Sequence, residues 1–480
     1  MRYRPSPITI DDIGRDLDDN RFTVVDLVEA HLARIKEVNH VFNAVLQVSP
    51  DVLAIAREMN REIQERGRRG YLHGVPILVK DNIYINKEMG GSAGSFAFLG
   101  SCLPREATVI SRLRKAGAII LGVAMALGLA PGSLGTETYG SIVLPSQKNN
   151  VVGFRTTTGL VPRDGVIPLC DWQDTIGPMT RTVKDAAHIL TVIAGKSPYD
   201  DATHSIPMKN IPDYSQASAG SNLSGIRLGV PRRAIPSTNP IVLAKFEQTL
   251  NKLASLGATI VDNRRRALEA EFKASINRWC GSLVTNPQGI KSLDDLIDFI
   301  KKDPREIFPE RNIERLLGAQ ESPGVDALIT QNALKKMLRC CADEGILAAL
   351  KRDKLDALVF PNEAGFPVFA VPLGFYPPGT AVKKTKGEQI DIAPNIPYGI
   401  EFSAEPYSEF KLTRISHAFQ ISWSLPEITP DLLPKTELTA ASNSIAPLGT
   451  LFCSFIEYKS PLITQSYVDS LFGNSASFFS

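Results

Sequence analysis

Apolar positions over the first seventy residues recur every three or four residues, which predicts helices rather than strands. Thr23 is followed by Asp26 at the position of a helix capping box. Val28 and Ile35 then fall on one helical face. Residues 75–79 read VPILV, a short continuous apolar run that is typical of a buried strand. The start of the chain therefore predicts a layer of helices followed by a strand of a central sheet.

Helical and extended patterns then alternate along the chain. A helix over 106–116 leads into a strand at 118–121, and Thr182, with Asp185 three residues on, begins another helix. The other predicted elements are strands at 226–230, 258–261, 355–360 and 368–371 and a helix that begins at Pro240. This alternation predicts an α/β fold, with a large mixed, mostly parallel central sheet covered by helices on both faces. Residues 267–350 read as a helical cap.

Composition and charge exclude several kinds of protein. The 480 residues include 53 basic and 51 acidic ones, so the net charge of +2 creates no global field that would recruit nucleic acid or an acidic membrane. Six cysteines without regular spacing indicate free thiols in a reducing compartment. The N-terminus has no apolar core of a secretory signal, which predicts a cytoplasmic location. The uncharged run 116–136 contains several glycines and a proline, which favours buried core over a membrane span. The oligomeric state is not indicated.

Two short stretches carry candidate catalytic side chains. Ser141 follows the glycine-bounded run 135–140. A tight turn there would expose its hydroxyl and direct backbone N–H groups toward a point where an oxyanion could sit. Lys80 comes where the strand 75–79 ends, and a lysine at the end of a buried strand is costly unless it has a task. Taken alone, the serine segment is weak evidence, and a structural turn is the favoured interpretation.

Three blocks together resemble the amidase signature family, in the family's order. They are 74–82 (GVPILVKDN), 135–142 (GTETYGSI) and 159–183 (GLVPRDGVIPLCDWQDTIGPMTRTV). The resemblance implies the amidase signature fold and a Ser–Ser–Lys triad. Such a triad hydrolyses a small-molecule amide to a carboxylate and ammonia or an amine through an acyl-enzyme, and it needs no cofactor or metal.

The family's functional residues carry over to five positions of this sequence. Lys80 matches the triad lysine, and Ser141 matches the nucleophile. The backbone of Thr138, Tyr139 and Gly140 matches the oxyanion hole, with Tyr139 where many family members have glycine. Because a lysine base has to be neutral, burial of Lys80 would be needed to lower its pKa from the ordinary value near ~10.4.

The middle serine of the triad has no counterpart here. In the family, a glycine- and serine-rich loop carrying that serine follows the strand, and a buried helix then leads to the GTET block. Here residues 123–130 follow Gly122 directly and resemble the end of that helix. We therefore expect an amidase-signature domain over 1–437 with an internal deletion near 122–126. Residues 438–480 read as an atypical, loosely ordered extension.

Three other serines are candidates to replace the relay. Ser133 is near in sequence but not at the relay position, and Ser92 and Ser95 lie in a glycine–serine loop for which a structural role is expected. Without a relay, Lys80 would have to act on Ser141 directly or through water, at a cost of about 10²–10⁴-fold in rate. Three hypotheses therefore stay open: an impaired or direct Ser–Lys amidase, a non-catalytic binding or scaffold protein, and a wrongly joined coding sequence.

Overall fold

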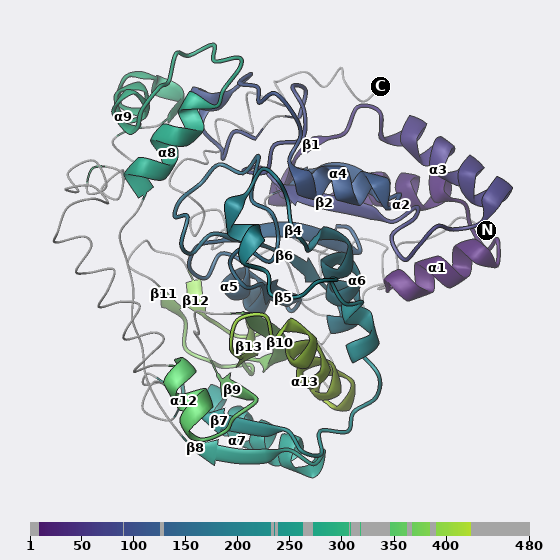
Figure 1. The fold of residues 1–480 in the computed structure, drawn as a ribbon, viewed down its shortest axis with the longest axis vertical. Coiled ribbons are helices and arrows are strands. Elements are labelled where there is room, and N and C mark those ends of the chain that lie inside the picture. The colour runs from purple at the N-terminus through teal and green to yellow at the C-terminus, as the bar shows by residue number, and fades with distance from the viewer. Residues whose placement is uncertain are drawn as a thin grey trace.

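The computed structural model describes residues 9–89, 91–124, 129–231, 239–262, 272–306, 346–361, 367–384 and 390–423, together with residues 235, 308 and 317. Within this part of the chain, one sheet has the strand order β1-β3-β2-β4-β6-β5-β10-β13-β9-β7-β8 (Figure 1). Its strands are β1 (Val45–Val48), β2 (Pro76–Lys80), β3 (Ile119–Ala124), β4 (Gly132–Glu137), β5 (Val152–Arg155), β6 (Thr175–Thr180), β7 (Arg227–Val230), β8 (Thr259–Asp262), β9 (Ala357–Phe360), β10 (Val368–Phe375) and β13 (Pro397–Ser403). A separate pair is formed by β11 (Lys383–Lys384) and β12 (Ile390–Ile392).

The predicted mixed α/β sheet is confirmed, but the expectation that it is mostly parallel is wrong. Strand β2 runs parallel to both β3 and β4, and β7 runs parallel to both β8 and β9. Every other neighbouring pair of described strands in this sheet is antiparallel. The alternation of elements suggested helical crossovers throughout. However, β10 and β13 are neighbours that pair antiparallel, which needs no crossover helix.

Helices cover both faces of the sheet. The described α-helices are α1 (Ile10–Asp18), α2 (Val24–Phe42), α3 (Val52–Arg66), α4 (Thr108–Lys115), α5 (Val143–Lys148), α6 (Val183–Ile193), α7 (Pro240–Ser255), α8 (Phe272–Gly281), α9 (Leu293–Lys302), α12 (Ile346–Arg352) and α13 (Glu409–Ser422). Helices α6 and α13 pack together, and both contact the central strands. The short α5 contacts β5, β10 and β13, and its Val143 clusters with Val368 and Ala370 on the opposite face.

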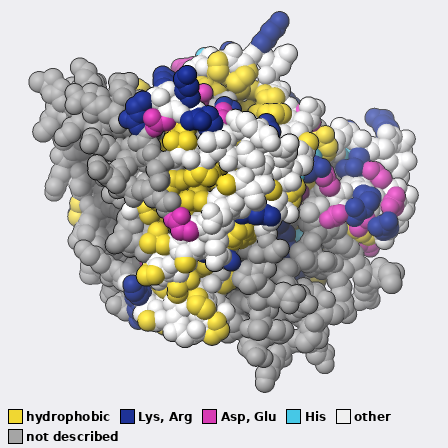
Figure 2. All heavy atoms as spheres, turned by 90° about the horizontal axis from the view of Figure 1, so that it is seen from below, with side chains coloured by type: hydrophobic (Ala, Val, Ile, Leu, Met, Phe, Trp, Pro, Cys, Tyr) yellow, Lys and Arg dark blue, Asp and Glu magenta, His cyan; other side chains and the backbone are white. Residues whose placement is uncertain are grey.

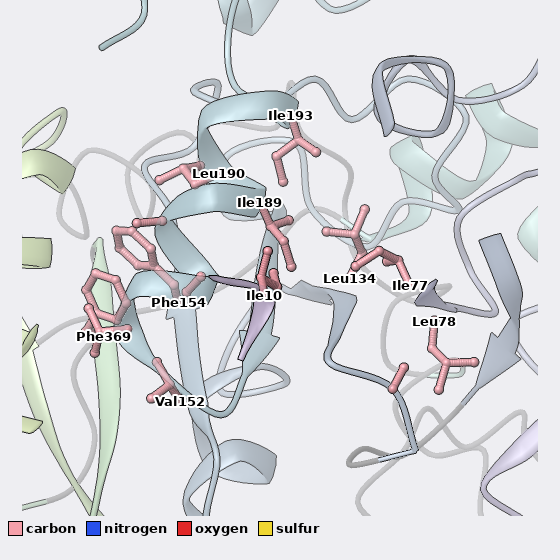
Figure 3. Packing of buried hydrophobic residues seen from close by; sticks show 14 of the residues in the cluster. Ile10, Ile77, Leu78, Leu134, Val152, Phe154, Ile189, Leu190, Ile193 and Phe369 are labelled. Atoms are coloured by element: carbon pink, nitrogen blue, oxygen red, sulfur yellow. The ribbon is translucent and has the colours of Figure 1, made fainter. Parts of the chain in front are cut away.

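The largest cluster of buried side chains lies beneath α6. Ile189 and Leu190 of α6 lie over Phe154 of β5, close to Ile77 of β2 (Figure 3). The rings of Phe154 and Phe369 stack with centroids 3.6 Å apart. Burying side chains of this size removes about 1.5–3 kcal/mol of unfavourable hydration each. This packing fixes β2, β4, β5 and β6 relative to one another, and these strands carry the candidate catalytic segments.

Two predicted helix starts are confirmed in atomic detail. Thr23 and Asp26 form a complete capping box at the start of α2. Thr182 caps α6 by accepting a hydrogen bond from the backbone N–H of Asp185 at 3.0 Å. The Asp185 carboxylate, however, accepts a hydrogen bond from the backbone N–H of Ile10 at 2.8 Å. That aspartate therefore joins α1 to α6.

The described parts of the predicted cap, residues 267–350, contain the helices α8, α9 and α12, and residues 282–292 between α8 and α9 are not helical. Helices α8 and α9 pack against each other, and α9 contacts the short 3₁₀ helix at Phe96–Phe98. Ser95 donates a hydrogen bond to the buried carboxylate of Glu306 at 2.7 Å, which ties the end of this helical segment to the loop after β2. The predicted extension at 438–480 and most of 307–345 lie outside the described residues.

The surface carries charges of both signs. In the view from below, hydrophobic side chains form a band over the middle of the face, and acidic and basic side chains are interspersed at its edge (Figure 2). Such mixing agrees with the net charge of +2. In the part of the chain that the structure describes, no helix combines the length and the apolar character needed to cross a bilayer.

Replacement of Gly177 by alanine is expected to lower the free energy of unfolding by about 3 kcal/mol, because overpacking of a rigid contact is destabilising. A Cβ atom on Gly177 would lie 1.8 Å from the carbonyl oxygen of Phe154 on the neighbouring strand, and that oxygen belongs to the sheet backbone. Urea unfolding measures the loss. Gly70→Ala is the matched control, since nothing lies within 4 Å of its added Cβ. Equal stability of the two variants would contradict this prediction.

Candidate active site

Lys80 is the last residue of β2, as its position after an apolar run predicted. Its ammonium group donates a hydrogen bond to the backbone carbonyl oxygen of Thr136 on the neighbouring strand β4 at 3.0 Å. Thr136 is also joined to the β2 end by its hydroxyl, which accepts a hydrogen bond from the side-chain amide of Asn82 at 2.9 Å. These contacts fix the lysine side chain against the strand that leads into the serine turn.

The environment of Lys80 makes its neutral form more accessible than that of an exposed lysine. The residue is partly buried as a whole, but burial of its ammonium group lowers the pKa to about 8, while the carboxylates of Glu137 and Asp174 act to raise it. A lysine with this pKa is neutral in a substantial fraction of molecules at slightly alkaline pH. Lys80 is therefore able to accept a proton near physiological pH.

Ser141 lies on the turn between β4 and α5. Gly140 has a φ of +81°, a left-handed conformation that favours glycine at this position. The Ser141 side chain is exposed, whereas Ile142 and Val143 directly after it are buried. Residues 138–142 form the bend and turn on which Ser141 is exposed, whereas residues 135–137, which were expected in the turn, belong to strand β4. The buried residues after Ser141 anchor the turn in the core.

Glu137 stabilises this turn through the backbone that follows Ser141. One of its carboxylate oxygens accepts hydrogen bonds from the backbone N–H groups of Ile142 at 2.8 Å and Val143 at 3.0 Å. The other oxygen forms an ion pair with Nε of Arg155 at 3.2 Å, and both side chains are almost completely buried. The carboxylate therefore caps the start of α5 and holds the backbone immediately after Ser141.

The register of the sheet brings these groups to one face. Leu78 of β2 pairs with Ser133 of β4, so the side chains of these two residues lie on the same face of the sheet. Every second side chain of a strand lies on the same face. Lys80, two residues after Leu78, and Glu137, four residues after Ser133, are therefore on that face as well. Met179 pairs with both Ser133 and Gly153, which puts Arg155, two residues after Gly153, on that side as well. This is the face that α5 covers.

The loop that contains Asp174 closes the other side of the turn. The hydroxyl of Thr138 donates a short hydrogen bond to one carboxylate oxygen of Asp174. The other oxygen accepts the backbone N–H groups of Leu169 at 2.6 Å and Cys170 at 2.9 Å. Burial raises the pKa of Asp174. Asp174 thus ties the turn to the loop.

A cavity of about 300 Å³ opens beside the turn. Asn82, Thr136 and Thr138 line it on the side of the sheet, and the loop after β5 lines the opposite side. Because Thr136 accepts the Lys80 hydrogen bond and Thr138 belongs to the predicted oxyanion turn, the cavity adjoins both candidate catalytic segments. In the described part of the chain, no group of three or more histidine, cysteine or acidic side chains is placed to hold a metal ion.

Ser92, Ser95 and Ser133, the candidate replacements for the relay, each form a hydrogen bond with a different partner. Ser133 donates to the carbonyl oxygen of Met179 at 3.4 Å, and Ser92 donates to Asp81 at 2.6 Å. With Ser95 bonded to Glu306, the interpretation of Ser92 and Ser95 as structural residues agrees with these contacts. Sequence reasoning missed Glu137 and its partner Arg155. The glutamate stands inside the second block, but its partner is distant in sequence and only the strand register reveals the pair.

The connection between β3 and β4 is unusually short. Strands β3 and β4 lie on opposite sides of β2, and both run parallel to it. The connection from the C-terminal end of β3 to the N-terminal end of β4 therefore has to cross β2 and run back along its length. Only residues 125–131 are available for this connection, whereas such crossovers usually take about a dozen residues or more and contain a helix. The reading of 123–130 as the end of a helix is wrong for Val123 and Ala124, which extend β3, and 125–128 lie outside the described residues.

A protein-family model described as Amidase matches the chain in two segments, residues 26–125 and 121–370. A protein of Arthroderma benhamiae that is named as an amidase is 35% identical over 485 aligned positions, covering 86% of this chain and 82% of the relative. A protein of Arabidopsis thaliana named as an amidase is 31% identical, with 86% and 89% covered. The first of these alignments is longer than the whole chain, so that relative carries residues with no counterpart here.

Solved structures share the fold. The native peptide amidase from Stenotrophomonas maltophilia superimposes with a TM-score of 0.74 at 29% identity, covering 86% of this chain and 96% of that one. An amidase family protein from Bacillus anthracis gives a TM-score of 0.75 at 25% identity, with 86% and 90% covered. The fold is thus that of a class of hydrolases that cleave carbon–nitrogen bonds.

The chain belongs to the Amidase family. Membership and structural neighbours together support hydrolysis of amide carbon–nitrogen bonds, and none of them favours a protein without catalytic function.

Proposed function

We propose that this chain hydrolyses a small carboxamide with Ser141 as the nucleophile and Lys80 as the base. The observation that carries this assignment is the hydrogen bond of Lys80 to Thr136, because it links a lysine of lowered pKa to the strand that ends in the serine turn. A neutral Lys80 accepts the hydroxyl proton of Ser141, directly or through one water molecule, as the oxygen attacks the amide carbonyl carbon.

The backbone N–H groups at Thr138, Tyr139 and Gly140 stabilise the negative charge that develops on the carbonyl oxygen. The carbon–nitrogen bond then breaks, the protonated lysine returns a proton to the leaving nitrogen, and an acyl-enzyme remains on Ser141. Water, deprotonated by the same lysine, releases the carboxylic acid. The steps balance without a metal or an organic cofactor.

We further propose the domain layout indicated by the sequence: an amidase domain over 1–437 with a cap at about 267–350, a deletion near 122–126 and an extension over 438–480. The seven-residue connection between β3 and β4 and the division of the family match at 121–125 support the position of the deletion. Because the relay serine belongs to the absent segment, catalysis is about 10²–10⁴-fold slower than with a complete triad. A cytoplasmic location without nucleic acid as a partner fits the balanced charge.

The pH dependence of hydrolysis tests the role of Lys80. We expect kcat/KM for a small amide such as benzamide to rise about tenfold per pH unit below pH 8 and to level above it, because only neutral Lys80 accepts the proton and its pKa is about 8. Ammonia release measured from pH 6 to pH 10 gives the profile. In Lys80→Met the rise should disappear together with most of the activity. A wild-type profile that is flat across this range would rule out the lysine as the base.

A further inference from the structure

The cavity beside the serine turn has a distinctive distribution of charge and apolar surface. Its lining combines charged side chains, among them Arg163, Asp164 and Asp174, with an apolar wall that includes Ile167, Leu169 and Trp279. Its volume of about 300 Å³ lies at the lower end of the range of small-molecule sites. One ring or a branched aliphatic group fits a space of this size.

Arg163, the cationic side chain of the described cavity lining, is already bound by other groups of the protein. Arg163 binds the Asp200 carboxylate with two nitrogens, Nε and Nη2, each at 3.0 Å. Its third nitrogen, Nη1, donates to the backbone carbonyl oxygen of Asp171 at 2.5 Å. A ligand carboxylate would therefore have to compete with a buried bidentate ion pair, which is the strongest geometry for an arginine.

Several carboxylates of the lining are held by the protein in the same way. Asp164 forms an ion pair with Arg105 at 2.5 Å and accepts hydrogen bonds from the backbone N–H and the hydroxyl of Thr108 at 3.1 and 2.9 Å. Asp174 accepts two backbone N–H groups and the Thr138 hydroxyl. Each of these carboxylates is therefore already compensated by a cation or by hydrogen-bond donors of the protein, so neither is available as a partner for a charged ligand group.

The remaining wall is apolar. Ile167 and Trp279 belong to one buried hydrophobic cluster that joins the loop after β5 to helix α8 of the cap. Leu169 is 41% exposed and Tyr199 is 58% exposed, and both line the cavity. The guanidinium group of Arg105 lies 3.3 Å from the centre of the Tyr199 ring, which fixes the ring in place by a cation–π interaction.

We infer that this cavity takes an uncharged aromatic or branched aliphatic group of the amide substrate and rejects a group that carries a carboxylate. An apolar group gains from contact with Ile167, Leu169 and Trp279, whereas a carboxylate would lose its hydration without finding an available cation among the described lining residues. This inference deepens the proposed function, on which it rests for treating the occupant as part of an amide substrate.

Equilibrium binding to Ser141→Ala protein tests the inference without turnover. Three para-substituted benzamides serve as probes: 4-methylbenzamide, 4-carbamoylbenzoate and 4-(aminomethyl)benzamide. They place a neutral, an anionic or a cationic group on the same ring, and titration calorimetry gives each dissociation constant. We expect the methyl compound to bind at least about tenfold more tightly than the carboxylate and more tightly than the ammonium compound. Equal or tighter binding of either charged compound, or no saturable binding of any of the three, would overturn the inference.

A second comparison connects the binding to this cavity. Leu169→Glu adds a charge to the cavity wall at a partly exposed site, so we expect the affinity for 4-methylbenzamide to fall about tenfold or more. Val284→Glu is the matched control, because Val284 is 63% exposed and does not line the cavity, and its affinity should be unchanged. An unchanged affinity in Leu169→Glu would overturn the inference. Failure of the proposed catalytic role would appear differently, as binding in the expected order without hydrolysis by the wild-type protein.

Discussion

Glu137→Ala is expected to lower the free energy of unfolding by about 3–5 kcal/mol, because it breaks a buried ion pair on one side only. Arg155 would stay buried with its charge no longer paired to a carboxylate, and its remaining described hydrogen bond goes to the carbonyl oxygen of Gln173 at 3.0 Å. The backbone N–H groups of Ile142 and Val143 would lose their acceptor as well. Since single domains are stable by only about 5–15 kcal/mol, this is a large share of the total.

Urea unfolding followed by circular dichroism measures this loss. Asp298→Ala is a suitable control, since it removes an ion pair with Lys302 on α9 that lies in solvent and contributes little to stability. Glu137→Gln should fall between the two, because a neutral amide still accepts a hydrogen bond but no longer compensates the arginine charge. A loss below about 1 kcal/mol in Glu137→Ala would mean that the carboxylate does not hold the turn as described.

The second large effect concerns the short connection between β3 and β4. Insertion of the glycine- and serine-rich loop and helix of a family member after Ala124, the last residue of β3, is expected to raise the hydrolysis rate by about 10²–10⁴-fold, because it would supply the relay between Ser141 and Lys80 that we propose is absent. The insert returns the crossover between two parallel neighbours of β2 to an ordinary length. Ammonia release from benzamide measures the rate.

The control is the same insert with alanine in place of its middle serine. That protein should match the first one in thermal stability and keep the low rate of the unaltered chain. If both inserted proteins hydrolyse benzamide equally fast, the gain would come from restored packing and the absent relay would not be the cause of slow catalysis.

Local signals in the sequence predicted local structure well. Thr23 and Thr182 begin helices as expected, because a capping side chain and its partner are three residues apart. Lys80 was placed correctly at the end of its strand, since an apolar run is a short-range pattern. These features need no knowledge of the rest of the fold. Strand β4, which precedes the Ser141 turn, was not predicted, because its sequence GSLGTE is rich in glycine and the resemblance implied a helix before the GTET block.

Features that depend on distant pairing were not predictable in this way. The antiparallel centre of the sheet follows from which strands become neighbours, and β5 pairs with β10 more than two hundred residues later. The contact of Asp185 with Ile10 likewise joins the two ends of a long stretch of chain. In the sequence, Glu137 was only one residue of the GTETYGSI block. Its role is revealed by the strand register that brings Arg155 beside it.

The most direct test of the catalytic assignment is to identify the residue that an activated electrophile modifies. The protein is treated with a fluorophosphonate, from which a serine alkoxide displaces fluoride to form a phosphonyl ester, and the digested chain is analysed by mass spectrometry. We expect a phosphonylated Ser141, slower modification in Lys80→Met and none at this position in Ser141→Ala. Hydrolysis of benzamide by a protein whose Ser141 stays unmodified, or that persists in Ser141→Ala, would contradict it.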